Sequence, residues 1–241
     1  KLHGNNYQFT HAVIDAASSG LELPLKHAGV GLARKIGMDL VLPHLISPKS
    51  LIFCTDADTK VSPDYLSKVT QYFDSYNTSA AVIDFGHLQS EDSAINDAIG
   101  KYENFLKTTA EKMKNAGSPY GYVSMGSTIV CTAEAYCAVG GMSRKKATED
   151  FYFLQELTKY CGVHNIPEIL VFPSPRPISR VYLGTGYRME QIQKGFDITN
   201  LYYSDDAYRY LSKWLQLGGS AWENSLNDLL KDIKLIHPNL I

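Results

Sequence analysis

Several features that define common protein classes are missing from this sequence. No apolar run approaches the ~18 residues that a membrane span needs, and no secretory signal peptide is visible. The four cysteines, at positions 54, 131, 137 and 161, show neither C-x-x-C spacing nor the density of a disulfide scaffold. The net charge is −2, so there is no basic field to attract nucleic acid. We therefore expect a cytoplasmic protein with reduced thiols and no nucleic-acid partner.

The composition is that of an ordinary globular protein with a sizeable core. The chain has 241 residues, of which 44% are hydrophobic and 20% are charged. This length allows one large α/β domain, or one domain with an appendage. We predict a main domain over residues 1–199 and a helical extension over residues 200–241.

The stretch Leu51–Thr59 organises the chain because it joins an apolar strand to two carboxylates. Residues 51–54 are apolar and lead into Asp56 and Asp58. A short continuous apolar run predicts a strand that is buried on both faces, as in a parallel sheet. Ligands of open α/β sheets bind beyond the carboxyl ends of the strands. Two carboxylates at that place suit a divalent cation, Mg²⁺ or Mn²⁺, that also holds phosphate oxygens.

Either aspartate has an alternative role as the cap of a helix predicted over residues 63–76. Ser62 followed by Pro63 is the better match for that cap, because serine is a preferred capping residue and proline is favoured at the first helical position. His87 and His164 are candidates for a third metal ligand, and a structural role is the simpler interpretation of each.

The rest of the chain alternates between helical and strand patterns. Helices are predicted at 29–46, where Pro43 should end or kink the helix, and at 63–76, 93–115, 149–160, 208–217 and 222–236. Strands are predicted at 9–16, 80–85, 123–132 and 164–172, and a long loop at 173–189. The chain is therefore predicted to be α/β.

A second acidic pair, Glu149-Asp150, follows Thr148 at the head of the helix predicted over 149–160. Acidic residues in a first helical turn are favoured by the helix dipole, which gives the pair a structural interpretation. An aspartate at a helix start that faces a metal-bound phosphate donor is also a suitable general base for a hydroxyl. The spacing alone leaves both interpretations open.

Two basic segments are candidates for anion contacts. Lys26 and Arg34 flank a glycine-bearing turn at residues 29–31, and backbone amides and cations in such a turn suit an anion. Arg176 and Arg180 lie in the loop predicted over 173–189, and arginine suits bidentate phosphate binding. A solvated helix face and a surface loop are the alternatives.

Taken in order, these pieces resemble a bacterial family 2 glycosyltransferase of the GT-A fold. Three segments carry the resemblance in the family's order: Gly29–Gly37 before the metal strand, Cys54–Asp58 as the D-x-D motif, and residues 126–150, from Gly126-Ser127 to Glu149-Asp150, as the acceptor-side strand and E-D motif. The likeness covers about residues 20–190. It implies a mostly parallel α/β sheet flanked by helices, with a helical C-terminal tail.

The resemblance also implies roles, one residue at a time. Asp58, with Asp56, would bind the divalent metal (Mn²⁺ or Mg²⁺) that bridges the diphosphate of a nucleotide sugar. Asp150 would deprotonate the acceptor hydroxyl for an inverting displacement, and Glu149 would place the acceptor or the base. The resemblance further implies that the donor is contacted by Lys26, Arg34, Arg176 and Arg180. It implies that the acceptor is contacted by Gly126 and Ser127. The implied partners are a nucleotide-sugar donor and a glycan or lipid-linked acceptor.

The N-terminal part departs from this family. Its members usually begin with two strands, and the second ends in an aspartate that grips the nucleotide base. Only about 50 residues precede the metal strand here, with Asp15 as a candidate for that aspartate. Either the N-terminal part is incomplete or the nucleotide pocket is built differently, so the donor base stays unassigned.

Two other functions stay open. An apolar strand followed by Asp-x-Asp also resembles the haloacid dehalogenase-like phosphatases, in which Asp56 would accept the phosphoryl group and Asp58 would act as general acid, with Asp205-Asp206 as further carboxylates. That interpretation leaves the Glu149-Asp150 pair unexplained. The third function is a non-catalytic domain that binds a nucleotide or a glycan.

A peripheral contact at the inner face of the membrane is a further expectation if the acceptor is a lipid. Trp214, Leu215 and Leu217 of the tail are the candidate residues, and core packing is their alternative role.

Overall fold

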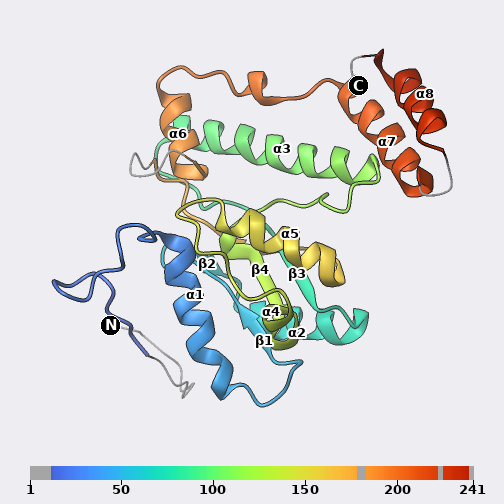
Figure 1. Cartoon of the computed structure of the whole chain (residues 1–241). Coiled ribbons are helices and arrows are strands. Elements are labelled where there is room, and N and C mark those ends of the chain that lie inside the picture. The colour runs from blue at the N-terminus through green and yellow to red at the C-terminus, as the bar shows by residue number, and fades with distance from the viewer. Residues whose placement is uncertain (1–11, 178–182, 222–224, 239–241) are drawn as a thin grey trace.

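The computed structural model describes residues 12–177, 183–221 and 225–238, which form an α/β structure around a mixed sheet (Figure 1). In chain order the elements are α1 (Val30–Val41), a 3-10 turn at Leu42–His44, β1 (Leu51–Phe53), β2 (Lys60–Val61), α2 (Tyr65–Tyr76), β3 (Ala80–Phe85), α3 (Ser93–Asn115), a 3-10 turn at Gly126–Thr128, β4 (Ile129–Thr132), α4 (Ala133–Ala138), α5 (Glu149–Cys161), β5 (His164–Phe172), α6 (Thr185–Gln193), a 3-10 turn at Ile198–Leu201, α7 (Asp205–Ser220) and α8 (Leu226–Ile236).

The sheet is mixed, so the prediction of a mostly parallel sheet is wrong, and the arrangement expected of a GT-A fold is not confirmed. The strand order is β1-β4-β3-β5-β2, and β3 with β5 is the parallel pair of neighbours. The pairs β1–β4, β3–β4 and β2–β5 are antiparallel. The apolar run at 51–54 misled the prediction because it indicates covered faces, and covered faces do not determine the direction of a neighbouring strand.

The strand directions nevertheless bring the predicted site residues to one edge of the sheet. Because β4 is antiparallel to both β1 and β3, and β3 is parallel to β5, the three strands β1, β3 and β5 run the same way. Their carboxyl ends therefore point to the same edge. Asp56 and Asp58 follow β1, and Arg176 follows β5.

Both faces of the sheet are covered by helices. Alternate residues of β3 point to opposite faces: Ala80 and Val82 pack in one core cluster, and Ala81 and Ile83 pack in the other. The first cluster takes side chains from α1, α4 and α5, and the second takes side chains from α2. The helix α1 thus shares a face of the sheet with α5, and this brings two sequence-distant helices together.

The C-terminal half adds helices around α3. Ala98 and Ile99 of α3 bury Met189 of α6, which lies within the segment predicted as loop. The helices α7 and α8 pack against each other, and Figure 1 shows them at the end of α3 that is remote from the sheet. Trp214 of α7 is 51% exposed. The domain boundary at 199/200 and the membrane contact stay predictions.

Three local predictions met different outcomes. Pro43 does end α1, because the helix stops at Val41 and a 3-10 turn follows. The strand predicted at 9–16 is wrong over residues 12–16, where Asp15 instead accepts hydrogen bonds from the next turn, and residues 9–11 lie outside the described ranges. Ser62 is not the cap of α2: its hydroxyl binds the carboxylate of Asp64, the residue at the cap position.

Within the described ranges, no helix combines the length and the apolar character that crossing a bilayer requires.

Candidate functional site

Arg34 of α1 joins the two acidic motifs. Its Nη2 donates to Oδ1 of Asp56, which follows β1, and its Nη1 donates to Oε1 of Glu149, the first residue of α5. The arginine and glutamate side chains are 12% and 4% exposed, whereas the Asp56 side chain is 42% exposed. One guanidinium therefore connects a buried carboxylate, 115 positions away in the sequence, to a half-exposed one that is 22 positions away.

Gly126 allows the guanidinium to occupy this position. A Cβ atom at residue 126 would lie 2.0 Å from Nη1 of Arg34 and 2.3 Å from its Cζ and Nη2. The backbone before β4 thus lies directly against the arginine. Ser127, predicted with Gly126 to contact an acceptor, is only 1% exposed, so its side chain faces the core in this structure.

The segment before α5 is held against the first turn of α1. A Cβ atom on Gly31 would lie 2.5 Å from the carbonyl oxygen of Ser143 and 2.3 Å from that of Lys145. A Cβ atom on Gly29 would lie 2.6 Å from Cα of Lys146. The glycines of this turn therefore permit close backbone contact, whereas the sequence had suggested an anion-binding turn.

Thr148 stands in a strained conformation at the cap position of α5. Its φ is 60° and its ψ is 20°, in the left-handed region that a β-branched residue rarely adopts. Its hydroxyl donates to the carbonyl of Ala147 and does not cap the helix. Conformations of this kind cost of the order of 1–3 kcal/mol and concentrate at functional sites. Thr148 directly precedes Glu149, the residue that pairs with Arg34.

Burial dominates the electrostatics of the acidic pair at the start of α5. It raises the pKa of Asp150, and the Phe151 amide and Arg34 lower that pKa to a smaller extent. Burial and the neighbouring charge of Asp150 raise the pKa of Glu149 against the effect of Arg34. The raised pKa makes Asp150 a stronger proton acceptor than an exposed aspartate.

The surroundings of Arg34 also favour its charge. Burial alone would lower its pKa, but Cys54, Asp56 and Glu149 raise it on balance. The Cys54 thiol lies close by, and burial raises its pKa to about 11. This thiol is therefore protonated at neutral pH and is not a nucleophile.

Asp58 pairs with the loop that follows β5. Nη2 of Arg176 lies 2.7 Å from Oδ2 of Asp58, and the two side chains are 62% and 38% exposed. The two residues are therefore in contact, and their assignment to one donor site stays a prediction. Lys26 is exposed and has no recorded contact with these residues in the part of the chain that the structure describes. Arg180 lies outside the described residues.

The residues present fit a metal ion that takes most of its ligands from a substrate. No group of three or more His, Cys, Asp or Glu side chains suitable for a metal occurs among the described residues, so they form no complete protein cage. Mg²⁺ and Mn²⁺ in phosphate-transfer sites need only one or two carboxylates, with phosphate and water as the other ligands. Asp58 and the half-exposed Asp56 are the two carboxylates that would have to provide this minimum, and each pairs with an arginine here, Asp58 with Arg176 and Asp56 with Arg34.

The histidines considered as a third metal ligand and the further carboxylates of the phosphatase alternative lie away from Asp56 and Asp58. His87 binds Glu103 at 2.6 Å, and His164 stacks edge-on with Tyr72 and Tyr76 at the amino end of β5. Neither histidine shares a recorded contact with the two aspartates after β1. Asp205, which the phosphatase interpretation would use, pairs with Lys112 near the C-terminal end of α3.

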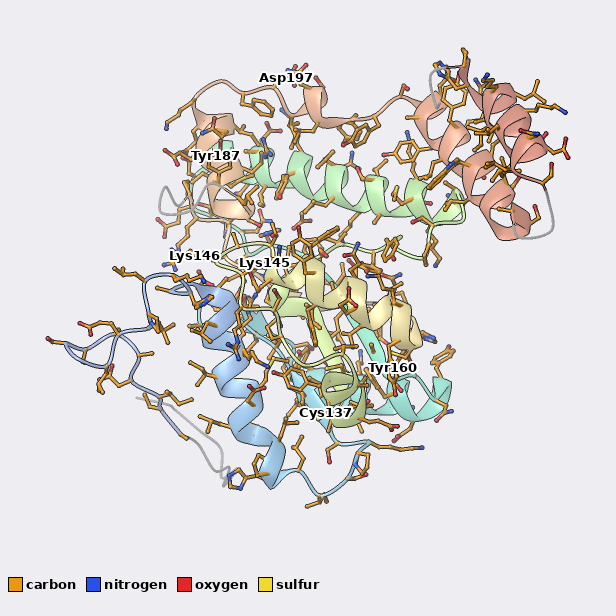
Figure 2. All side chains as sticks on the ribbon, in the orientation of Figure 1. Cys137, Lys145, Lys146, Tyr160, Tyr187 and Asp197 are labelled. Carbon is orange, nitrogen blue, oxygen red and sulfur yellow. The ribbon has the colours of Figure 1, made fainter. Side chains whose placement is uncertain are left out.

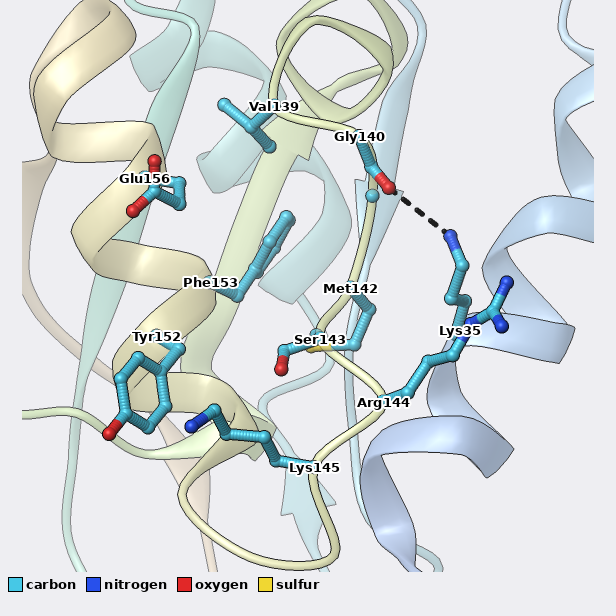
Figure 3. A pocket seen from close by; sticks show the side chains of 11 residues that line it. Lys35, Val139, Gly140, Met142, Ser143, Arg144, Lys145, Tyr152, Phe153 and Glu156 are labelled. Carbon is cyan, nitrogen blue, oxygen red and sulfur yellow. Dashed lines mark hydrogen bonds between the residues drawn. The ribbon is translucent and has the colours of Figure 1, made fainter. Parts of the chain in front are cut away.

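One feature beside the site was missed by the sequence reasoning. A cavity of about 430 Å³ lies between α1, the 139–145 segment and α5 (Figure 3). Lys35, Arg144 and Lys145 line it, together with one carboxylate, that of Glu156. The available signal was the basic run 144–146 between the Gly140-Gly141 break and the Glu149-Asp150 pair.

The comparisons with known proteins do not add a family to this geometry. No protein-family model matches the chain, and no curated protein matches it with significance.

Proposed function

We propose that this protein is an inverting glycosyltransferase that moves a sugar from a nucleotide-sugar donor to an acceptor hydroxyl. One observation carries the proposal. The D-x-D segment and the E-D segment, 92 positions apart from Asp58 to Asp150, meet at the guanidinium of Arg34. A purely structural origin of the two motifs would not require them to converge at the carboxyl edge of the sheet, where ligands of α/β folds bind.

Asp150 is the proposed general base. It stands next to Glu149, which Arg34 holds in place, and burial raises its pKa toward the range in which a base works best near neutral pH. The carboxylate accepts the proton of the acceptor hydroxyl while the oxygen attacks the anomeric carbon from the face opposite the leaving diphosphate. Glu149 orients the acceptor side through its bond to Arg34.

Asp58, Asp56 and Arg176 form the proposed donor side. Arg176 carries a forked guanidinium within reach of Asp58, and this group suits the charge of a diphosphate. A divalent ion held by Asp58 and Asp56 would neutralise the charge that grows on the leaving diphosphate. Arg176 is exposed enough to exchange Asp58 for a phosphate when the donor arrives.

The phosphatase alternative has less support. Its further carboxylates, Asp205 and Asp206, pair with Lys112 and Arg209 on α3 and α7. Figure 1 shows α7 at the remote end of α3, away from β1. The binding-only alternative uses the same site residues as the proposal, so an experiment must separate binding from turnover.

A thermal-shift screen tests the donor side. Wild type and Asp58→Asn are heated with UDP, GDP, CDP or dTDP, with and without Mn²⁺. A ligand at 100 times its Kd stabilises the folded state by about 2.7 kcal/mol, which raises Tm by roughly 5–10 °C at this chain length. We expect a manganese-dependent shift with one nucleotide that Asp58→Asn abolishes. No shift with any nucleotide would contradict the proposal.

Asp150→Asn separates transfer from binding. We expect this variant to keep the nucleotide-induced shift of wild type and to lose about 10²–10⁴-fold in product formation with the matching sugar nucleotide, because it lacks the base. Mass spectrometry of the acceptor measures the product. Nucleotide binding without product from wild type, with any donor sugar, would favour the binding-only function.

A further inference from the structure

The 430 Å³ cavity beside α5 carries an excess of positive charge. Its lining includes the three cations Lys35, Arg144 and Lys145 against the single carboxylate of Glu156. Glu156 is already engaged, because its Oε1 lies 2.7 Å from Nζ of Lys159. Lys35 is engaged as well, because its Nζ lies 3.2 Å from Oδ2 of Asp39, so the excess positive charge of the cavity comes from Arg144 and Lys145.

Two of these cations have no carboxylate partner in the part of the chain that the structure describes. Nζ of Lys145 lies 3.6 Å from the centre of the Tyr152 ring, and Arg144 makes no recorded ion pair. Figure 3 shows the Lys145 side chain directed toward that ring. Lys146 continues the basic run and is labelled beside Lys145 in Figure 2. A cation held by an aromatic face keeps its charge available to an anion.

The wall of the cavity is built by constrained backbone. Gly141 has φ +78°, and a Cβ atom there would lie 2.8 Å from Nζ of Lys35 and 2.9 Å from the Tyr136 ring. Nζ of Lys35 lies 3.3 Å from the carbonyl oxygen of Gly140, as Figure 3 shows. The loop is thus pressed onto Lys35 and positions it at the cavity. A volume of this size is within the range of small-molecule sites.

The position of the cavity separates it from the proposed donor side. Asp56, Asp58 and Arg176 do not line it, whereas Tyr152, Phe153 and Glu156 of α5 do. These three residues belong to the same helix as Asp150, the second residue of α5. A ligand in the cavity would therefore contact the helix whose first turn carries the proposed base.

We infer that this cavity binds an oxyanion, a phosphate or a carboxylate, that belongs to the acceptor substrate. The assignment to the acceptor rests on the proposed function, whereas the assignment to an oxyanion rests on the cations alone. Two kinds of acceptor carry a phosphate group: a soluble sugar phosphate and a lipid phosphate at a membrane surface. Figure 3 shows Lys145 on the Tyr152 side of the cavity and Arg144 on the Lys35 side, so charge-assisted hydrogen bonds from either cation would hold the oxyanion.

The test compares Arg144→Gln/Lys145→Gln with Lys213→Gln/Lys234→Gln, a control that removes two exposed lysines without recorded ion pairs on α7 and α8. Isothermal titration with inorganic phosphate measures the oxyanion site, and titration with UDP and Mn²⁺ measures the donor side. We expect phosphate affinity to fall at least tenfold in the cavity variant and to change less than twofold in the control. UDP affinity should stay within twofold of wild type in both.

Three results would overturn the inference: no phosphate binding by wild type, equal phosphate affinity in wild type and the cavity variant, or an equal loss in the control. A parallel loss of UDP affinity in the cavity variant would assign the cavity to the donor and overturn the acceptor role. Loss of phosphate binding in the variant, with no UDP binding by wild type, would uphold the oxyanion site while the proposed function fails.

Glucose 1-phosphate and phosphatidylcholine vesicles with or without phosphatidic acid then distinguish the two sources. Titration with the sugar phosphate and vesicle sedimentation are both compared between wild type and the cavity variant. A loss in the sugar-phosphate arm supports a soluble acceptor, and a loss confined to the phosphatidic-acid arm supports a lipid one. Unchanged behaviour of the variant in both arms would contradict the inference.

Discussion

Replacing Arg34 with methionine should be among the most destabilising single changes at the site. The variant leaves Glu149 with a 4%-exposed side chain and no cation. Removing one partner of a buried ion pair costs about 3–5 kcal/mol, because the remaining charge stays buried without compensation. The bond to Asp56 adds at most about 1 kcal/mol, since that side chain is 42% exposed. Urea unfolding followed by circular dichroism should therefore show a loss of about 3–5 kcal/mol.

Matched variants separate the two halves of the network. Asp56→Asn should lower stability by less than about 1 kcal/mol. Arg34→Met combined with Glu149→Gln should recover part of the loss, with a coupling energy of about 1–3 kcal/mol between Arg34 and Glu149. Additive losses in this cycle would show that the two side chains do not depend on each other.

The loss should also depend on pH in one direction. Arg34 lowers the pKa of Glu149, which burial has already raised, so its removal raises the pKa of Glu149 further. A carboxyl group whose pKa is higher in the folded than in the unfolded state gains stability as the pH falls through the folded value. The difference between wild type and Arg34→Met should therefore shrink from pH 8 toward pH 5. A loss below about 1 kcal/mol that does not vary with pH would refute the reasoning.

Three further predictions concern the helices around the site. Gly31→Ala should destabilise by about 1–3 kcal/mol because its Cβ would overlap carbonyl oxygens of the 143–146 segment. Gly37→Ala in the same helix has open space around it and should stabilise by about 0.5–1 kcal/mol. Urea midpoints measure both changes, and stability changes of the same sign in the two variants would contradict the packing. Thr148→Gly should stabilise by about 1 kcal/mol in the same assay by relieving its positive φ, and a loss would show that the threonine side chain compensates for the strain. Asp150→Asn should raise Tm at neutral pH, because burial raises the pKa of Asp150 and its charged form opposes folding. The gain in Tm should grow as the pH rises through that pKa. A lower Tm of the variant at every pH would contradict this prediction.

Local structure was the part that the sequence predicted well. The helix at 93–115 and the strand at 80–85 have the bounds that their periodicity indicates, and Asp92 caps the helix through the amide of Ala94. Two aspartates after an apolar strand were enough to predict their position at an edge of the sheet. In each case the determining interactions lie within a few residues of sequence.

Other features depended on contacts between distant segments. The segment 173–189 was predicted as loop because it is rich in proline, arginine and glycine, yet α6 begins within it at Thr185, and Met189 of this helix packs against α3. The basic run 144–146 had no visible meaning until the fold placed it beside α5 and Lys35.

The sequence by itself determined which residues are apolar, which are charged, and the bounds of a few strongly periodic elements such as α3 and β3. The tertiary structure decided the directions of β2 and β4, the bonds of Arg34 to Asp56 and Glu149, and the cavity beside α5. The physical reason is the range of the interactions. Helix periodicity and capping act over three or four residues. Strand pairing and buried ion pairs join segments up to 115 positions apart, and their partners are chosen by the packing of the whole chain.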